Sequence, residues 1–249
     1  MELLDARVLV TGGTSGIGAS LVQSLTAAGA RVVTCGRDAE RGAALAARHP
    51  DVTVLRSDLS EAGAPRRVVE DAAAALDGLD VVVNNAAVQV HDSYVAPSPG
   101  IDLRIAHELA VNLRAPLEIT AAALPLLSRS DRGALVFVTS GLAVFPKKTA
   151  PVYCATKAAL RTFATAVRYQ VADEAPSVRV IDVVLPLVDT PMTAGRGDDA
   201  GKRSPDDVAA RIVRVLGGSG QTVRIGKARI LPVFERMAPS VGRRILRKG

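Results

Sequence analysis

The chain has 249 residues, with 31 lysines and arginines against 25 aspartates and glutamates, and so a formal net charge of +6. Hydrophobic residues make up 48% of it, which excludes a disordered or fibrous chain. A positive net charge is compatible with a nucleic-acid partner. Only three tyrosines, four phenylalanines and no tryptophan are present, however, which argues against a surface that stacks bases. We therefore expect no nucleic-acid partner.

Short β-branched runs alternate along the chain with longer stretches rich in alanine and leucine. Strands are predicted at Arg7–Val10, Arg31–Cys35, Val52–Ser57, Asp80–Asn84, Ala134–Thr139, Val178–Val184 and Thr222–Ile225. Helices are predicted at Gly16–Ala28, Ala39–Arg48, Ala62–Leu76, Asp102–Leu127, Val152–Asp173 and Pro205–Leu216. This alternation predicts an α/β fold of the Rossmann type, a doubly wound, seven-stranded parallel sheet with helices on both faces.

Two loops follow predicted strands and contain proline, glycine or small polar residues. They span residues 91–100 and 190–203. Ligands of doubly wound folds bind beyond the carboxyl ends of the strands. We therefore expect both loops to shape a substrate site within a single domain of residues 1–227.

A glycine-rich turn follows the first predicted strand, with the sequence Thr11-Gly12-Gly13-Thr14-Ser15-Gly16-Ile17-Gly18. Glycines there let the backbone approach a pyrophosphate, and the N-terminus of the next helix attracts its charge. The spacing differs from the usual G-x-G-x-x-G pattern. A tight strand–helix connection without a ligand is the alternative interpretation.

The second predicted strand leads into Gly36-Arg37, where a dinucleotide-binding fold meets the adenosine ribose. An acid at this place is typical of NAD sites, whereas a guanidinium suits the 2′-phosphate of NADP. Asp38 comes one position later, where the next helix needs a cap. The sequence therefore favours NADP(H) as the cofactor over an ordinary surface role for Arg37.

Tyr153 and Lys157 are four residues apart near the start of a predicted helix, so they share one face. A phenol ordinarily titrates near pH 10, and a nearby cation lowers its pKa and makes it a usable general acid or base. By itself such a pair is more often an ordinary surface pair.

In combination, these motifs resemble the classical short-chain dehydrogenase/reductase family. The matching residues, in chain order, are Thr11–Gly18, Asn84-Asn85-Ala86-Ala87, Asn112, Ser140 and the pair Tyr153/Lys157. The resemblance covers about residues 5–195, and the joint match is far more specific than any single motif. Residues 139–143 and 183–192 further resemble the DltE-like branch of the family.

The resemblance implies a catalytic set of Asn112, Ser140, Tyr153 and Lys157. In that family the serine binds the substrate oxygen, the tyrosine is the general acid/base, and the lysine binds the nicotinamide ribose and lowers the tyrosine pKa. Asn112 would hold a water of the proton relay. The implied cofactor-binding residues are Gly12, Thr14, Ser15, Gly16, Ile17, Gly18, Arg37, Asp58, Leu59, Asn85, Ala86, Tyr153, Lys157, Val188 and Thr190.

Two positions depart from the family pattern. Ala87 replaces the last glycine of N-N-A-G, which is a mild change. Leu187 replaces the glycine of P-G-x3-T, and we expect its side chain close to the place of the nicotinamide carboxamide.

The positive charge is concentrated at the C-terminal end. Residues 224–249 carry eight basic residues and one acid, and so +7, whereas residues 1–223 sum to −1. Apolar residues recur every three or four positions from Ile230 to Ile245, an amphipathic period that Pro232 and Pro239 must break or kink. Residues 228–249 are thus predicted to form a basic amphipathic segment of the same domain, packed on its own subunit or on a partner. Peripheral contact with an anionic membrane or an acidic partner is the alternative.

Cysteine and histidine usage predicts no metal site. Cys35 and Cys154 form neither a disulfide framework nor a ligand spacing, and the three histidines add none; His107 is interpreted as a packing or surface residue. The acidic N-terminus and the lack of a long apolar run predict a cytoplasmic protein.

We therefore expect an NADP(H)-dependent oxidoreductase that transfers a hydride between nicotinamide and a small carbonyl, alcohol or imine-type substrate, as a homo-oligomer (dimer or tetramer). The alternative is a non-catalytic NADP(H)-binding redox sensor or scaffold that engages a partner or membrane through its C-terminal segment. The complete catalytic set argues against that alternative, and Leu187 argues weakly for it.

Overall fold

Seven parallel strands form one sheet in the computed structural model, which describes all residues except 1, 196–201, 239 and 241–249. The strand order is β3-β2-β1-β4-β5-β6-β7, and the order reverses between β1 and β4. The strands are β1 (Arg7–Thr11), β2 (Arg31–Gly36), β3 (Thr53–Arg56), β4 (Val81–Asn84), β5 (Ala134–Ser140), β6 (Arg179–Leu185) and β7 (Thr222–Arg224). The predicted Rossmann-type sheet is confirmed, and each strand end lies within one residue of its prediction.

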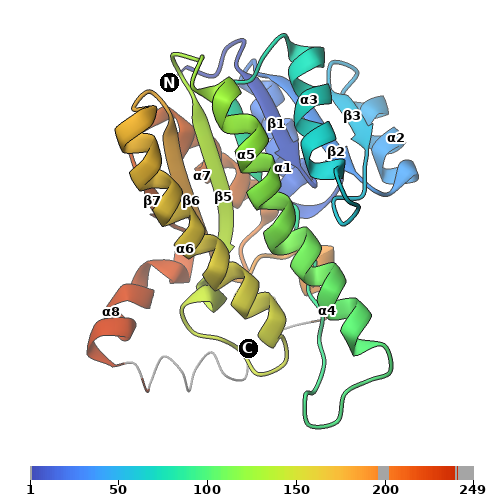
Figure 1. The fold of residues 1–249 in the computed structure, drawn as a ribbon, viewed down its shortest axis with the longest axis vertical. Helices are drawn as coiled ribbons and strands as arrows, with labels where there is room; N and C mark the ends of the chain where they lie inside the picture. Colours follow the sequence, from blue (N-terminus) through green and yellow to red (C-terminus); the bar gives the residue numbers. More distant parts are fainter. Residues whose placement is uncertain (1, 196–201, 239, 241–249) are drawn as a thin grey trace.

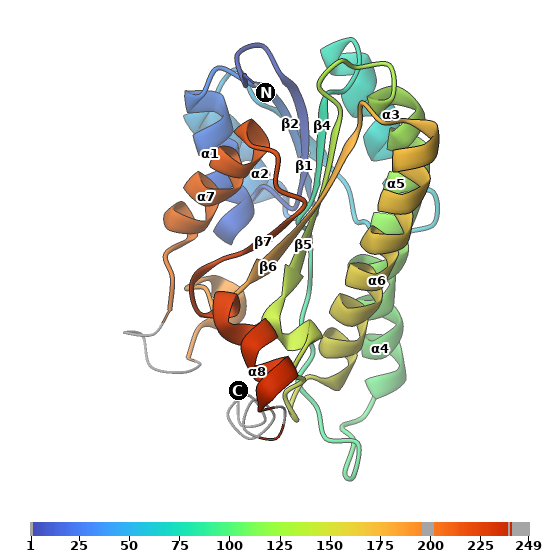
Figure 2. The same cartoon turned by 90° about the vertical axis from the view of Figure 1, so that its left-hand side faces the viewer.

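Helices cover both faces of the sheet, as Figure 2 shows edge-on. One face carries α1 (Gly16–Ala27), α2 (Ala39–Arg48) and α7 (Pro205–Gly217). The other carries α3 (Ala64–Leu76), α5 (Ala115–Leu127) and α6 (Pro151–Glu174). Strands such as Val81–Val83 are wholly buried because each face is covered, which explains their continuous apolar sequence.

The helix predicted as one piece over residues 102–127 is interrupted. It consists of α4 (Ile101–Leu109), a π-helical turn (Ala110–Arg114) and α5. π-turns are rare and frequently accompany functional sites. Hydrophobic periodicity did not reveal this turn, because α4, the turn and α5 follow one another directly.

The helix predicted from Ala62 begins two residues later, at Ala64. Gly63 precedes it with a left-handed φ of 75°, and Pro65 occupies the first turn, where its missing N–H is tolerated. Two short 3-10 turns, Gly141–Ala143 and Pro191–Thr193, follow β5 and β6 at the carboxyl edge of the sheet.

The C-terminal part of the described chain lies at the carboxyl edge of the sheet (Figure 1). It comprises a 3-10 turn (Gly226–Ile230) and α8 (Leu231–Met237), and the predicted division at 227/228 falls inside that turn. Pro232 lies in the first turn of α8, where its missing N–H is tolerated, and the regular helix does not continue back into the turn that ends at Ile230. Pro239 lies outside the described residues. The basic residues from Arg243 to Lys248 lie outside the described residues.

An ionic cluster joins the amino ends of β1 and β4 to the start of β5. Asp80 is 1% exposed and accepts hydrogen bonds from Arg7 Nη2 at 2.7 Å and from Ser130 Oγ at 2.7 Å. Arg132 Nε lies 3.4 Å from its other oxygen. Burial alone would raise the pKa of Asp80, but the Arg7 and Ser130 bonds outweigh it and lower the pKa to about 2.

None of the described helices combines the length and the apolarity needed to span a membrane.

Candidate active site

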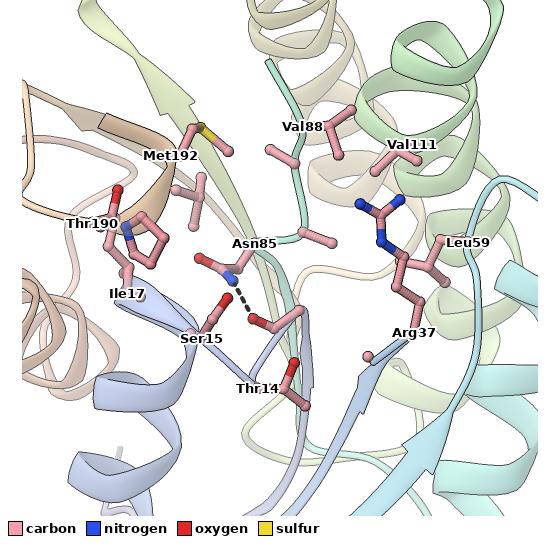
Figure 3. A pocket seen from close by; sticks show the side chains of 18 of the residues that line it. Thr14, Ser15, Ile17, Arg37, Leu59, Asn85, Val88, Val111, Thr190 and Met192 are labelled. Atoms are coloured by element: carbon pink, nitrogen blue, oxygen red, sulfur yellow. Dashed lines mark hydrogen bonds between the residues drawn. The ribbon is translucent and has the colours of Figure 1, made fainter. Parts of the chain in front are cut away.

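A cavity of about 630 Å³ lies along the carboxyl edge of the sheet, beside the ends of β1 and β4, where the strand order reverses (Figure 3). All the residues predicted to bind the cofactor line it except Val188. The prediction missed several further lining residues, which mostly directly neighbour the motifs in sequence. They are Cys35, Gly36, Asp38, Arg41, Ser57, Ala87, Val88, Gln89, Val111, Val138, Thr139, Leu185, Pro191 and Met192.

The glycine-rich turn packs too closely for side chains. A Cβ on Gly18 would lie 2.2 Å from the Gly12 carbonyl oxygen, and Gly12 itself has a φ of 68°. Asn85 fixes the turn to the end of β4, because its Nδ2 donates to the carbonyl oxygens of Thr11 at 2.9 Å and Gly12 at 3.3 Å (Figure 3). The Ser15 side chain makes no capping bond, so it leaves the first N–H groups of α1 to an anion.

The part of the cavity beyond the end of β2 carries two guanidinium groups. Arg37 lies beside Leu59, across the cavity from Ser15 and Thr190 (Figure 3). Its Nη1 is 3.2 Å from Nε2 of His107, which the sequence alone did not connect with this site. Arg41 also lines the cavity, and its backbone N–H is capped by Asp38 at 3.0 Å, in agreement with the capping role predicted for that acid.

The Asp58 carboxylate accepts hydrogen bonds from within its own loop. Its Oδ1 accepts from Ser60 N at 2.8 Å and from Ser60 Oγ at 2.7 Å. Burial would raise its pKa, but these bonds and the charges of His107 and Arg37 outweigh burial and lower it. Asp58 therefore contributes a negative charge to the lining of the cavity, and Ser60 fixes the orientation of its side chain.

These residues fit a nicotinamide dinucleotide. The volume is in the range of cofactor cavities. Glycines and free helix N–H groups meet the expected pyrophosphate, and Arg37 and Arg41 offer cationic groups at the end of β2. Asp38, the acid nearest to that position, is occupied as a cap.

Tyr153 and Lys157 lie on the first turns of α6 and face the cavity. Nζ of Lys157 donates to the Val138 carbonyl at 2.9 Å and lies 5.7 Å from the centre of the Tyr153 ring. Burial lowers the pKa of Lys157 to about 8, although the charges of Asp182 and Glu108 act in the opposite direction. The ammonium is thus held rigidly next to the phenol.

Ser140 is the last residue of β5, at the carboxyl edge of the sheet. Its Oγ accepts a hydrogen bond from Leu142 N at 3.1 Å, which leaves the hydroxyl proton available to a ligand. Ser140 and Tyr153 both line a second cavity of about 380 Å³, which adjoins the first. The structure thereby brings these two predicted catalytic residues together.

Asn112 lies within the π-turn and lines neither cavity. Its amide donates to the Val88 carbonyl and accepts from the Val88 N–H, both at 2.8 Å. Its Nδ2 is also 3.4 Å from Thr156 Oγ1. The side chain therefore clamps residue 88, and the water-holding role implied by the family stays a prediction.

The second cavity is mostly apolar. Its lining combines Ser140, Tyr153 and two lysines with the side chains of Ile17, Leu142, Leu185, Pro186, Leu187, Val188, Met192, Ala228 and Leu231, among others. Val188, predicted to bind the cofactor, lines this cavity instead. Leu187 lines it too and is absent from the lining of the first cavity; its expected place close to the nicotinamide carboxamide stays a prediction. The Leu187 carbonyl accepts from Arg203 N at 3.1 Å, which fixes the local backbone.

The two predicted substrate loops behave differently. Residues 91–100 are all described, and none of them lines either cavity. Asp92 organises that loop, with Oδ2 2.6 Å from Arg104 Nη2 and Oδ1 3.1 Å from Ser98 N. From the second loop, residues 190–192 line the first cavity and Thr193 the second, whereas 196–201 lie outside the described residues.

No group of three or more His, Cys, Asp or Glu residues that could hold a metal occurs within the described ranges.

Comparisons with known proteins agree with this geometry. The family model described as short chain dehydrogenase matches residues 6–201. "Uncharacterized oxidoreductase DltE" of Bacillus subtilis (strain 168) is 34% identical over 201 residues, 81% of this chain and 79% of that protein. "Dehydrogenase/reductase SDR family member 7B" of Bos taurus is 31% identical over 86% of this chain and 71% of its own. A short chain dehydrogenase from Burkholderia cenocepacia J2315, solved in complex with NADP, superposes with a TM-score of 0.82 at 29% identity, covering 92% of this chain and 100% of that one.

Proposed function

The chain belongs to the short-chain dehydrogenase/reductase family, and from this premise we propose that it is an NADP(H)-dependent oxidoreductase acting on a small, largely apolar carbonyl compound or the corresponding alcohol. One observation carries the proposal: Tyr153 lines both cavities, with Lys157 on the dinucleotide side and Ser140 on the apolar side. NADP(H) is supported by Arg37 and by the NADP complex of the Burkholderia cenocepacia relative.

The residues of the chain supply everything except the hydride, which bound NADP(H) would donate or accept. In the reducing direction, Ser140 and Tyr153 bind the substrate oxygen, and the Tyr153 hydroxyl gives up its proton as negative charge develops there. The Lys157 ammonium favours the resulting phenolate. In the oxidising direction Tyr153 takes the proton back.

The apolar lining of the second cavity restricts the substrate. Leu142, Leu187 and Leu231 favour a hydrocarbon body, and water is displaced where the reacting oxygen meets Ser140. Residues 228–249 are proposed to belong to the same domain as residues 1–227, since Ala228 and Leu231 form part of this wall. The homo-oligomeric state and the cytoplasmic location stay predictions.

Replacement of Tyr153 tests the chemistry. NADPH oxidation is followed with a panel of aliphatic and aromatic aldehydes and ketones. Tyr153→Phe should lower kcat about 10²–10⁴-fold, because the proton donor is lost, while NADPH binding, followed by fluorescence, changes little. Tyr169→Phe, at an exposed tyrosine of the same helix, is the matched control.

Turnover by Tyr153→Phe at the wild-type rate would refute the catalytic assignment. NADPH binding by the wild type without turnover of any panel member would favour the redox-sensor alternative.

Replacement of Arg37 tests the cofactor. Arg37→Asp removes a charge-assisted contact to the 2′-phosphate and should lower kcat/KM for NADPH relative to NADH about 10–100-fold. Arg129→Asp makes the same charge change at an exposed residue that does not line the cavity. An unchanged preference in Arg37→Asp would overturn the assignment of NADP(H).

A further inference from the structure

A buried carboxylate outside the predicted catalytic set lies on α4, which packs against α6, the helix of Lys157. Glu108 of α4 is 0% exposed; its Oε1 accepts from Val90 N at 3.4 Å, and its Oε2 has no hydrogen-bond partner among the described residues. Such atoms are rare, because a buried polar atom without a partner costs free energy that no contact offsets. Among the described residues, only Asn84, at the end of β4, shares this property.

Glu108 and Asn112 hold the same segment of chain. They are four residues apart, and so lie about one turn apart along α4 and the π-turn. Asn112 pairs with both backbone groups of Val88, and Glu108 accepts from Val90 N. Val88 and the intervening Gln89 line the first cavity, and Gln89 lines the second as well. Glu108 is therefore connected to the walls of both cavities.

The charged groups that act on Glu108, or on a group that Glu108 itself influences, come from three parts of the chain. On α6, the Lys157 ammonium attracts the Glu108 carboxylate, and the charge of Glu108 contributes to the raised pKa of the Cys154 thiol. Lys147, in the loop before α6, is buried and acts on the same thiol. From β6, Asp182 acts on Lys157 from a second direction.

The two carboxylates that influence Lys157 differ in their own partners. Asp182 accepts from the Thr139 hydroxyl at 2.5 Å, and its other oxygen lies 3.7 Å from Arg161 Nε. Glu108 has only the long bond from Val90 N. Its charge is thus the less compensated of the two, and the Lys157 ammonium is the cation that acts on it.

The titration behaviour agrees with this geometry. Burial raises the pKa of Glu108 to about 7, although the Val90 N–H and Lys157 oppose the rise. Burial lowers the pKa of Lys157 to about 8. Two interacting groups with such close pKa values influence each other's protonation around neutral pH.

We propose that Glu108 is a positioning residue of the active site: with Asn112 it holds residues 88–90, and its carboxylate stabilises the Lys157 ammonium. The importance of that ammonium for turnover rests on the proposed function. The electrostatic coupling between Glu108 and Lys157 is a property of the protein alone and is tested without turnover.

The test is a ¹⁵N NMR titration of the Lys157 Nζ in the protein without cofactor. Glu108→Gln keeps an oxygen for the Val90 N–H and removes the charge. Its Lys157 midpoint should fall by about one pH unit, because the ammonium loses a stabilising anion. With a substrate found, the basic limb of the kcat/KM profile should shift toward lower pH in the same direction. Glu118→Gln, at a partly exposed glutamate of α5 that pairs with Arg114, is the matched control and should leave both unchanged.

An unchanged Lys157 midpoint in Glu108→Gln would overturn the proposal and leave Glu108 as a backbone clamp only. Should that variant fail to fold, a ¹³C titration of the Glu108 carboxyl in the wild type and in Lys157→Met decides: a midpoint that rises in Lys157→Met supports the proposal, because the carboxylate loses a stabilising cation, and an unchanged midpoint overturns it. Absence of turnover in the wild type would refute the proposed function and leave both titrations valid.

Discussion

Asp80 and Glu108 are equally buried carboxylates at opposite edges of the sheet, with opposite pKa shifts. Asp80, at the amino edge, is bound by Arg7 and Ser130 and approached by Arg132, and its pKa falls to about 2. Glu108, at the carboxyl edge, has one long hydrogen bond and one unpartnered oxygen, and its pKa rises to about 7. Burial acts in the same direction on both, so the number and charge of the partners decide the outcome.

This difference in partners separates Asp80, which stabilises the fold, from Glu108, which we propose to act in the active site. The amino edge is closed by an ionic cluster that satisfies its charges. At the carboxyl edge, buried side-chain atoms of Glu108 and Asn84 have no hydrogen-bond partner, and Asn85, which follows Asn84, lines the first cavity. Perturbed groups with few partners are typical of active sites, and within the described part of the chain the buried side-chain atoms without a hydrogen-bond partner belong to Asn84 and Glu108, at the edge where ligands of this fold bind.

The largest expected effect concerns the amino edge. Asp80→Asn leaves Arg7 facing a neutral amide at a buried position, and we expect the free energy of unfolding to fall by about 3–5 kcal/mol. Chemical denaturation at pH 7 measures this loss. Arg132→Met, which leaves the Arg7 pair intact, should cost clearly less. An equal loss in the two variants would contradict the assignment of Arg7 as the main partner.

The second prediction contrasts the pH dependence of stability at the two edges. The folded pKa of Asp80 is depressed, so its contribution is complete above the unfolded pKa near 3.9 and is lost as the pH falls toward 2. The folded pKa of Glu108 is raised, so its effect has the opposite sign. Relative to Glu108→Gln, the wild type is most stable below the unfolded pKa near 4.3 and loses about 2–3 kcal/mol as the pH rises through 7.

Urea denaturation of the wild type and Glu108→Gln at pH 5 and pH 9 measures that difference. A gap between the two proteins that is the same at both pH values would show that Glu108 titrates normally.

The smallest effect is expected for an exposed pair. Arg66 Nη1 lies 4.0 Å from Glu70 Oε1, and both side chains are more than half exposed. Arg66→Ala should change the free energy of unfolding by less than about 0.5 kcal/mol, because solvent screens the pair. A loss of unfolding free energy as large as that of Asp80→Asn would show that burial does not decide how much a charged pair contributes to stability.

Several features could be predicted from the sequence because they depend on local pattern. The strands were predicted to within one residue, since continuous β-branched runs mark a sheet covered on both faces. Thr11–Gly18 and Arg37 could be placed at one cavity because they follow neighbouring strands of a doubly wound fold. The pair Tyr153/Lys157 shares a helix face through its spacing alone.

Other features depend on contacts between residues far apart in the chain. Glu108 and His107 looked unremarkable because their partners, Lys157 and Arg37, are 49 and 70 positions away. The place of Leu187 in the lining of the second cavity could not be predicted either, since its backbone direction depends on the hydrogen bond from Arg203 N to its carbonyl oxygen. The loop at 91–100 folds on Asp92 and Arg104 and lines neither cavity, which composition does not reveal.

The sequence by itself thus determined the fold, the family resemblance and the position of the dinucleotide turn, because strand periodicity, glycine placement and helix spacing are local properties of the chain. Only the tertiary structure decided which polar groups are buried together and how well each is paired. That pairing separates Asp80 from Glu108, since the protonation of a buried group depends on the charges and hydrogen bonds that surround it in space.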